Sequence, residues 1–240
     1  MITFSTTPLT VSSVDTAPFG PGLPPDSTEE GRERNKAKYK EMAWMGRDLS
    51  EHANAFFKQL GATRRAKGGL LDFWNTLSDL TVLPCSPSLE YPRSDLPAKI
   101  HFIGGTPRKE LDPAMAVPEW WEELVAAKKQ QTGKKVVFVT QGTWMRDHSM
   151  LTIPTIKAFA DREDYLVIVV LGRKNAKLED LGRSMPSNAK VTDYLAYHAV
   201  LQYADVFVTN GGYGGFMQGI MHGVHMVLAG VESKFPVNCL

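Results

Sequence analysis

A cluster of glycines around one tyrosine is the part of the sequence best suited to chemistry. It comprises Asn210, Gly211, Gly212, Tyr213, Gly214 and Gly215. The cluster follows an apolar run at 206–208 and precedes a predicted helix that ends at His222. Glycine lets backbone amides approach a ligand closely, and a helix start presents unpaired N–H groups and a positive dipole end. The pattern predicts an anion site, typically for a phosphate, and a glycine-rich turn without a ligand is the alternative.

A second polar loop follows another apolar run. Gly142 and Thr143 come after the run at 136–139, which has the composition of a strand covered on both faces. Ligands of open α/β sheets bind at the carboxyl ends of the strands, so we expect both loops at one sheet edge. For Gly142 and Thr143 taken alone, a helix-entry turn is the alternative interpretation.

Other chemistries lack their motifs. A dinucleotide fingerprint starting at Gly212 fails, because Met217 occupies its third glycine position. Glu232 does lie about 20 residues beyond Gly212, where such enzymes carry a ribose-binding acid. A nicotinamide-dependent oxidoreductase therefore stays as a minor alternative. The sequence has no P-loop, no G-x-S-x-G elbow and no Asp-x-Asp pair, and His198 and His222 lack partners at metal-ligand spacing.

Charge and cysteine content exclude further classes of protein. Lys and Arg number 27 against 26 Asp and Glu, a formal net charge of +1, which disfavours a nucleic-acid partner. Cys85 and Cys239 form no disulfide framework and no zinc motif, which favours a reducing, cytoplasmic compartment. No apolar run approaches the roughly 20 residues of a membrane span, so we expect no transmembrane segment.

The elements that must position the two loops follow from the apolar pattern. Predicted strands at 136–139, 165–171, around 191, at 206–208 and at 226–229 alternate with helices, which predicts a parallel sheet. In the first half we expect strands at 81–83 and 100–103, and a long helix capped by Ser27 and Glu30. Residues 108–133, with one helix at 119–129, are interpreted as a linker between domains at 1–107 and 134–240.

Several of these sequence segments resemble those of one protein family. The stretch 204–215, with 136–143, 188–191, Tyr194-Leu195 and 222–224, resembles the nucleotide-sugar half of a UDP-glycosyltransferase. More narrowly, it is similar to the erythromycin- and macrolide-type enzymes. The stretches 15–20, 90–93 and 101–104 resemble the acceptor domain of that group.

The resemblance implies a fold and an activity. The fold would be α/β, with two Rossmann-like domains of glycosyltransferase-B type whose parallel sheets are flanked by helices, both of them incomplete here. Residues 1–107 would form the acceptor side and 134–240 the nucleotide-sugar side. The activity would be transfer of a hexose from a UDP- or TDP-sugar to a small lipophilic acceptor, with inversion, without a metal and without a cofactor.

The resemblance also implies roles for individual residues. Gly142 and Thr143 would face the donor diphosphate or nucleoside, and Tyr194 and Leu195 would lie near the base. Asn210, Gly211, Gly212, Tyr213, Gly214 and Gly215 would hold the phosphates, and Glu232 or Lys234 would approach the sugar hydroxyls.

This sequence departs from the family pattern in ways that affect activity. Asn210 stands where many relatives have a histidine, so a positive charge is lost, and Gly215 replaces a hydroxyl side chain. The family's catalytic His–Asp pair belongs to a segment that we expect to precede this chain, so no catalytic residue is assigned. We also expect the family's closing helices to follow Leu240. The chain by itself is then expected to transfer sugar weakly or not at all, and a non-catalytic nucleotide-sugar-binding module is the alternative.

Overall fold

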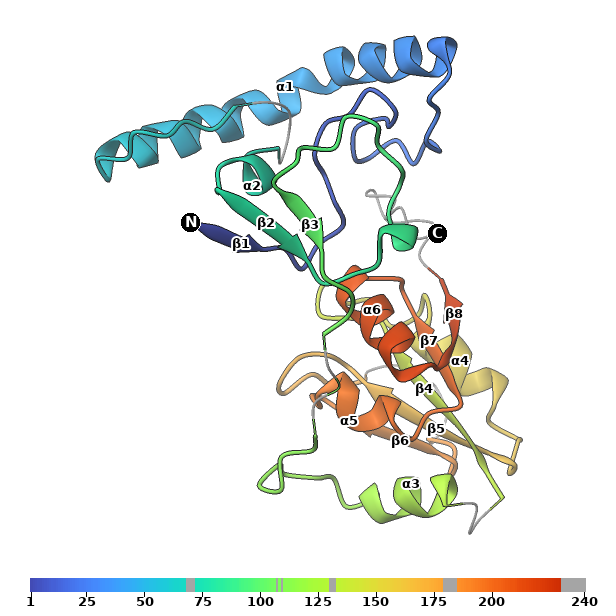
Figure 1. Cartoon of the computed structure of the whole chain (residues 1–240). Helices are drawn as coiled ribbons and strands as arrows, with labels where there is room; N and C mark the ends of the chain where they lie inside the picture. Colours follow the sequence, from blue (N-terminus) through green and yellow to red (C-terminus); the bar gives the residue numbers. More distant parts are fainter. Residues whose placement is uncertain (68–71, 107, 109, 130–132, 179–184, 230–240) are drawn as a thin grey trace. The chain divides into compact units, whose positions relative to one another are not determined.

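A computed structural model describes residues 1–67, 72–106, 108, 110–129, 133–178 and 185–229 (Figure 1). These residues form two compact units, of which the first takes in residues up to 106 and the second the described residues from 108 onward. Within the described residues, no helix combines the length and the apolar character needed to cross a lipid bilayer.

The second unit contains a five-stranded, fully parallel sheet. Its strands are β4 (Lys135–Thr140), β5 (Tyr165–Val170), β6 (Ala189–Thr192), β7 (Val206–Thr209) and β8 (His225–Leu228). They lie in the order β6-β5-β4-β7-β8, which is the order 3-2-1-4-5 of a Rossmann sheet. The predicted parallel sheet is confirmed, and the strand order reverses between β4 and β7.

The strands β4, β5 and β7 are apolar on both sides because helices cover both faces of this part of the sheet. On one face, Phe138 stacks on Phe207 at 4.8 Å between ring centroids, and α3 (Trp121–Lys128) and α5 (Tyr197–Leu201) cover this layer. On the other face, Val137 and Val139 pack with Ile156 of α4 (Thr152–Ala158). This two-sided burial explains why the strands read as continuous apolar runs.

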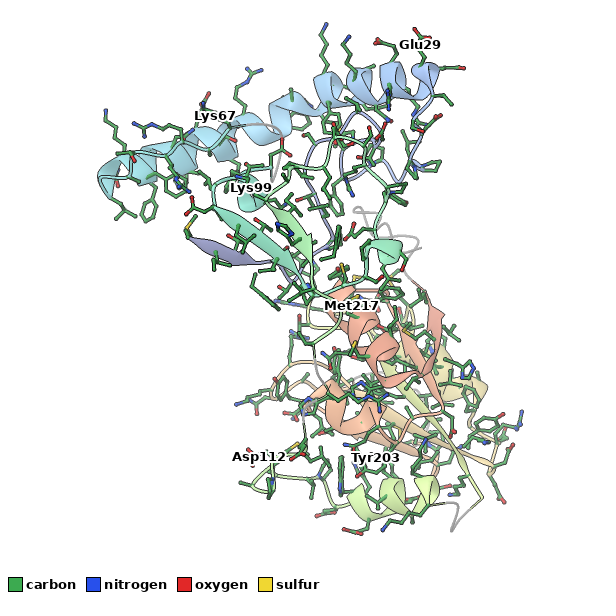
Figure 2. The ribbon with its side chains drawn as sticks, in the orientation of Figure 1. Glu29, Lys67, Lys99, Asp112, Tyr203 and Met217 are labelled. Atoms are coloured by element: carbon green, nitrogen blue, oxygen red, sulfur yellow. The ribbon has the colours of Figure 1, made fainter. Side chains whose placement is uncertain are left out.

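The segment 108–133, which we interpreted as a linker, is grouped by the structure with the second unit. Trp121, Leu124 and Ala127 of α3 are buried in the core of that unit. The Trp121 ring meets Tyr203 edge-on at 5.6 Å, and Tyr203 lies beside α3 in Figure 2. Burial of these side chains holds the segment against the sheet, because large aromatic rings contribute strongly to packing.

The first unit has a three-stranded parallel sheet in the order β1-β2-β3. Its strands are β1 (Ile2–Phe4), β2 (Leu80–Leu83) and β3 (Ile100–Phe102), and its helices are α1 (Glu29–Gln59), α2 (Asp72–Thr76) and a 3-10 turn at Pro87–Leu89. The predicted cap of α1 was wrong by one residue. The Thr28 hydroxyl accepts the Gly31 N–H at 3.1 Å, because Asp26 accepts both the Thr28 N–H and its hydroxyl and so orients Thr28.

Asp15 connects three segments of the first unit. Its carboxylate accepts the Ser94 N–H at 2.6 Å and two Arg32 guanidinium hydrogen bonds at 3.0 and 2.8 Å. The hydroxyl and backbone N–H of Ser94, followed by Arg32, lower the pKa of Asp15 from 3.8 to about 2. A carboxyl group whose pKa is lower in the folded state than in the unfolded state stabilises the fold at any pH above its unfolded pKa. This stabilisation is lost as the pH falls through the pKa of the folded state.

We therefore expect the melting temperature of the first unit to fall as the pH is lowered from about 4 to about 2, with Asp15 responsible for part of the fall. Asp15→Asn should be less stable at pH 6 and should show a shallower fall over this range. Thermal unfolding followed by circular dichroism measures both. The exposed Asp161→Asn serves as the control, and parallel profiles for Asp15→Asn and the wild type would contradict the prediction.

Candidate functional site

The structure brings the two predicted loops together at one sheet edge. Thr140 at the end of β4 pairs with Thr209 at the end of β7, so the loops that follow begin at the same level. A Cβ atom placed on Gly142 would lie 3.5 Å from the Asn210 side-chain oxygen. The loops therefore adjoin at the carboxyl edge, at the point where the strand order reverses. This is the place where open α/β sheets bind ligands.

Hydrogen bonds to residues of β4 and α5 hold the loop after β4 in place. The Gly142 N–H donates to the Thr140 hydroxyl oxygen at 3.2 Å, and that hydroxyl also contacts the Tyr197 hydroxyl at 3.2 Å. Gly142 has a φ of +73°, a conformation that glycine adopts without strain. Thr143, the other residue predicted here, is exposed.

Gln141 is a buried anchor of the same loop, and the sequence pattern did not single it out. Its side-chain N–H donates to the Asp147 carbonyl at 2.7 Å, and its side-chain oxygen accepts the Thr152 N–H at 2.9 Å. The middle and the far end of the loop 141–152 are thus both tied to the side chain of Gln141, a residue that is only 2% exposed. Gln141 holds the shape of the loop, whereas Gly142 and Thr143 stay available to a ligand.

Helix α6 (Tyr213–His222) begins directly at this edge. It starts at Tyr213, slightly earlier than predicted, with Gly212 as its N-cap and Gly211 buried at a φ of +75°. No side chain of the described residues caps the first turn. A Cβ on Gly214 would meet nothing within 4 Å, whereas one on Gly215 would contact Thr209 and core rings. The helix start is therefore open at the Gly214 side-chain position, and the first turn of a helix has N–H groups without intrahelical partners.

A third loop contributes Gly172, which was not among the predicted site residues. Gly172 follows β5 with a φ of +80°. A Cβ atom there would lie 2.5 Å from the Gly142 carbonyl oxygen and 3.4 Å from the Thr143 nitrogen. Only glycine fits this contact, so Gly172 fixes the position of the Gly142–Thr143 loop. Its sequence signal is the one that singled out Gly142, a glycine placed just after a buried apolar run.

The remaining predicted residues do not lie in the loops after β4 and β7. Tyr194 is 52% exposed and its N–H donates to Asp193 at 2.6 Å. Leu195 is buried in the sheet core, so its side chain is a packing residue. Both follow β6, which β5 separates from β4 in the sheet. Glu232 and Lys234 lie outside the described residues.

Solved structures identify the fold. The chain is similar over 99% of its length to 54% of the glycotransferase of kitacinnamycin, with a TM-score of 0.60 and 22% identity. It is also similar to the glycosyltransferase SnogD from Streptomyces nogalater, over 72% of this chain and 42% of that one, with a TM-score of 0.51 and 20% identity. The α/β fold with parallel sheets is that of the glycosyltransferase-B class.

Curated relatives identify the family, although no family model matches the chain. UDP-glucosyltransferase 1 of Beauveria bassiana is 42% identical over 232 residues, which is 94% of this chain and 49% of that protein. The 4'-demethylrebeccamycin synthase of Lentzea aerocolonigenes is 40% identical over 228 residues, with 94% and 51% covered. The chain belongs to the UDP-glycosyltransferase family, and it spans about half the length of the curated relatives it matches.

Proposed function

We propose that the second unit binds the nucleoside diphosphate of a UDP- or TDP-sugar for transfer of its hexose to a small lipophilic acceptor. The observation that carries this proposal is the junction of the Gly142–Thr143 loop with the first turn of α6 at the strand-order reversal. Backbone N–H groups and a helix N-terminus favour a phosphate at such a junction. The nucleoside then extends toward the loop after β6, where Tyr194 is accessible.

The same geometry suits the transfer step. Attack of an acceptor hydroxyl on the anomeric carbon breaks the bond to the diphosphate, which leaves with additional negative charge. The N–H groups of the α6 first turn and the positive end of the helix dipole stabilise that charge as it develops. Attack from the face opposite the leaving diphosphate gives inversion. We assign no general base to a residue of this chain, and general-base catalysis typically contributes about 10²–10⁴-fold to such a step.

The relatives support the donor class. The names of the Beauveria bassiana and Phaeomoniella chlamydospora proteins describe a UDP-glucosyltransferase and a UDP-glycosyltransferase, at 42% and 37% identity to this chain. A UDP-hexose is therefore the donor that we propose first, and a TDP-sugar is the second.

Calorimetric titration of the chain with UDP, TDP and NAD tests the proposal. We expect UDP to bind with a dissociation constant below about 1 mM and NAD not to bind in this range. Incubation with UDP-glucose and a panel of lipophilic acceptors then tests transfer, with Gly212→Asp and Gly214→Asp as inactive references. We expect product formation close to those references for the chain alone. Turnover well above the two references would contradict the expectation of weak or absent transfer, and a preference for NAD over UDP would contradict the proposal.

A further inference from the structure

A partly buried cation, Arg173, follows β5 at the sheet edge where we propose that the diphosphate binds. Arg173 directly follows Gly172, the residue whose backbone lies against the Gly142 carbonyl and the Thr143 nitrogen. The Arg173 N–H donates to the Asp193 carbonyl at 3.0 Å, which fixes its backbone at the end of β5. Arg173 therefore belongs to the same sheet edge as the loops after β4 and β7.

The Arg173 side chain is partly buried, and one of its nitrogens has no hydrogen-bond partner in the described part of the chain. Its Nε atom is buried, and no described residue forms a hydrogen bond with it. None of the ion pairs formed by the described residues involves Arg173. A buried polar atom without a hydrogen-bond partner is uncommon in native proteins. An anion at this position would supply the missing partner.

A second buried group stands close to Arg173. His148, from the loop after β4, is 9% exposed, and its Nδ1 atom also lacks a hydrogen-bond partner among the described residues. Burial, and next the positive charge of Arg173, lower the pKa of His148, against the opposing effect of Asp147. His148 is therefore neutral at pH 7 and adds no charge. The nearby Asp147 carboxylate already accepts the Ser149 N–H and hydroxyl at 2.9 and 2.5 Å.

We propose that the Arg173 guanidinium binds the diphosphate of the nucleotide and supplies a full positive charge opposite the α6 first turn. This inference rests on the proposed function. Asn210 is neutral, so the two glycine loops provide only the partial charges of backbone amides and a helix end. Two phosphates carry more negative charge than these can balance. The planar fork of arginine hydrogen bonds suits phosphate oxygens better than a lysine point charge does.

Titration of the wild type and two variants with UDP and with uridine tests the inference. We expect Arg173→Gln to weaken UDP binding by at least about tenfold and to change uridine binding by less than about twofold. Arg173→Lys should restore part of the affinity for UDP. Lys174→Gln, which removes the exposed cation next in sequence, should bind both ligands like the wild type.

Each outcome of the titration is decisive. Failure of the wild type to bind UDP would overturn the proposed function and this inference together. A wild type that binds UDP, with Arg173→Gln binding it equally well, would overturn the inference alone. Equal losses of UDP and uridine binding would also overturn it, because they indicate a structural role.

Chemical modification tests the same inference without a variant. Phenylglyoxal modifies arginine side chains, and peptide mass spectrometry reports the extent at Arg173 in the wild-type chain. We expect UDP to protect Arg173 and uridine not to protect it. Equal modification with and without UDP, under conditions in which UDP binds, would overturn the inference.

Discussion

Gly214→Asp is expected to weaken UDP binding by at least about 100-fold, because like charges about 4 Å apart near a protein surface repel by about 4 kcal/mol. Gly214 is exposed in the first turn of α6, and an added Cβ atom would meet nothing within 4 Å. The new side chain therefore starts from a Cβ atom in open space. It occupies the place, and has the charge, of the phosphate that we propose for this helix start.

The same substitution should leave the fold intact. An acidic residue in the first turn of a helix interacts favourably with the helix dipole, by about 0.3–1 kcal/mol. Calorimetry with UDP and thermal unfolding measure the two effects separately. Gly214→Ala is the matched control and should keep UDP affinity within about threefold, since it adds a side chain without charge. Equal UDP affinities for the two variants would contradict the proposal that a phosphate binds at the α6 N-terminus.

Gly172→Ala is expected to lower UDP affinity by at least about 30-fold and to destabilise the second unit by about 1–3 kcal/mol. Gly172 has a φ of +80°, and its new Cβ would lie 2.5 Å from the Gly142 carbonyl oxygen. That atom belongs to the backbone, so relief requires the loop 142–143 to move. The movement would displace the residues proposed to meet the diphosphate.

Gly223→Ala separates loop displacement from backbone strain. Gly223 ends α6 with a φ of +64°, and an added Cβ would meet nothing within 4 Å. Both variants share the left-handed strain, and only Gly172→Ala pushes on the site. We expect urea unfolding to show a smaller loss for Gly223→Ala and calorimetry to show unchanged UDP binding. Retained UDP affinity in Gly172→Ala would show that this contact does not shape the site.

The sequence predicted well those structural features that depend on residues close together in the chain. The run 165–171 is apolar at every position because helices cover both sides of the sheet, so it marked β5 correctly to within a residue. Gly142 and the cluster 210–215 were found because a glycine shortly after such a run indicates a sharp turn or a close approach to a ligand. The cap of α1 was misplaced because Ser27 and Thr28 are both suitable, and only Asp26 selects between them.

Contacts between residues that are far apart in the chain could not be predicted from the sequence. Gly172 carried the same local signal as Gly142, yet its importance arises from the pairing of β5 with β4, which brings residues 30 positions apart into contact. Arg173 is one of 27 basic residues, and its neighbours in the sequence do not distinguish it. Its buried Nε atom, which has no hydrogen-bond partner among the described residues, is visible only in the structure. Residues 108–133 read as a linker because burial of Trp121 depends on the sheet it packs against.

By itself the sequence determined the elements, the parallel sheet and the two glycine loops, since side-chain periodicity and glycine placement are local properties. Only the tertiary structure decided that β4 lies beside β7, because any order of the same strands would show the same apolar pattern. That order joins the two loops, and the pairing of β5 with β4 brings Gly172 against the Gly142–Thr143 loop. Burial and non-local strand pairing, rather than residue type, set the geometry of the site.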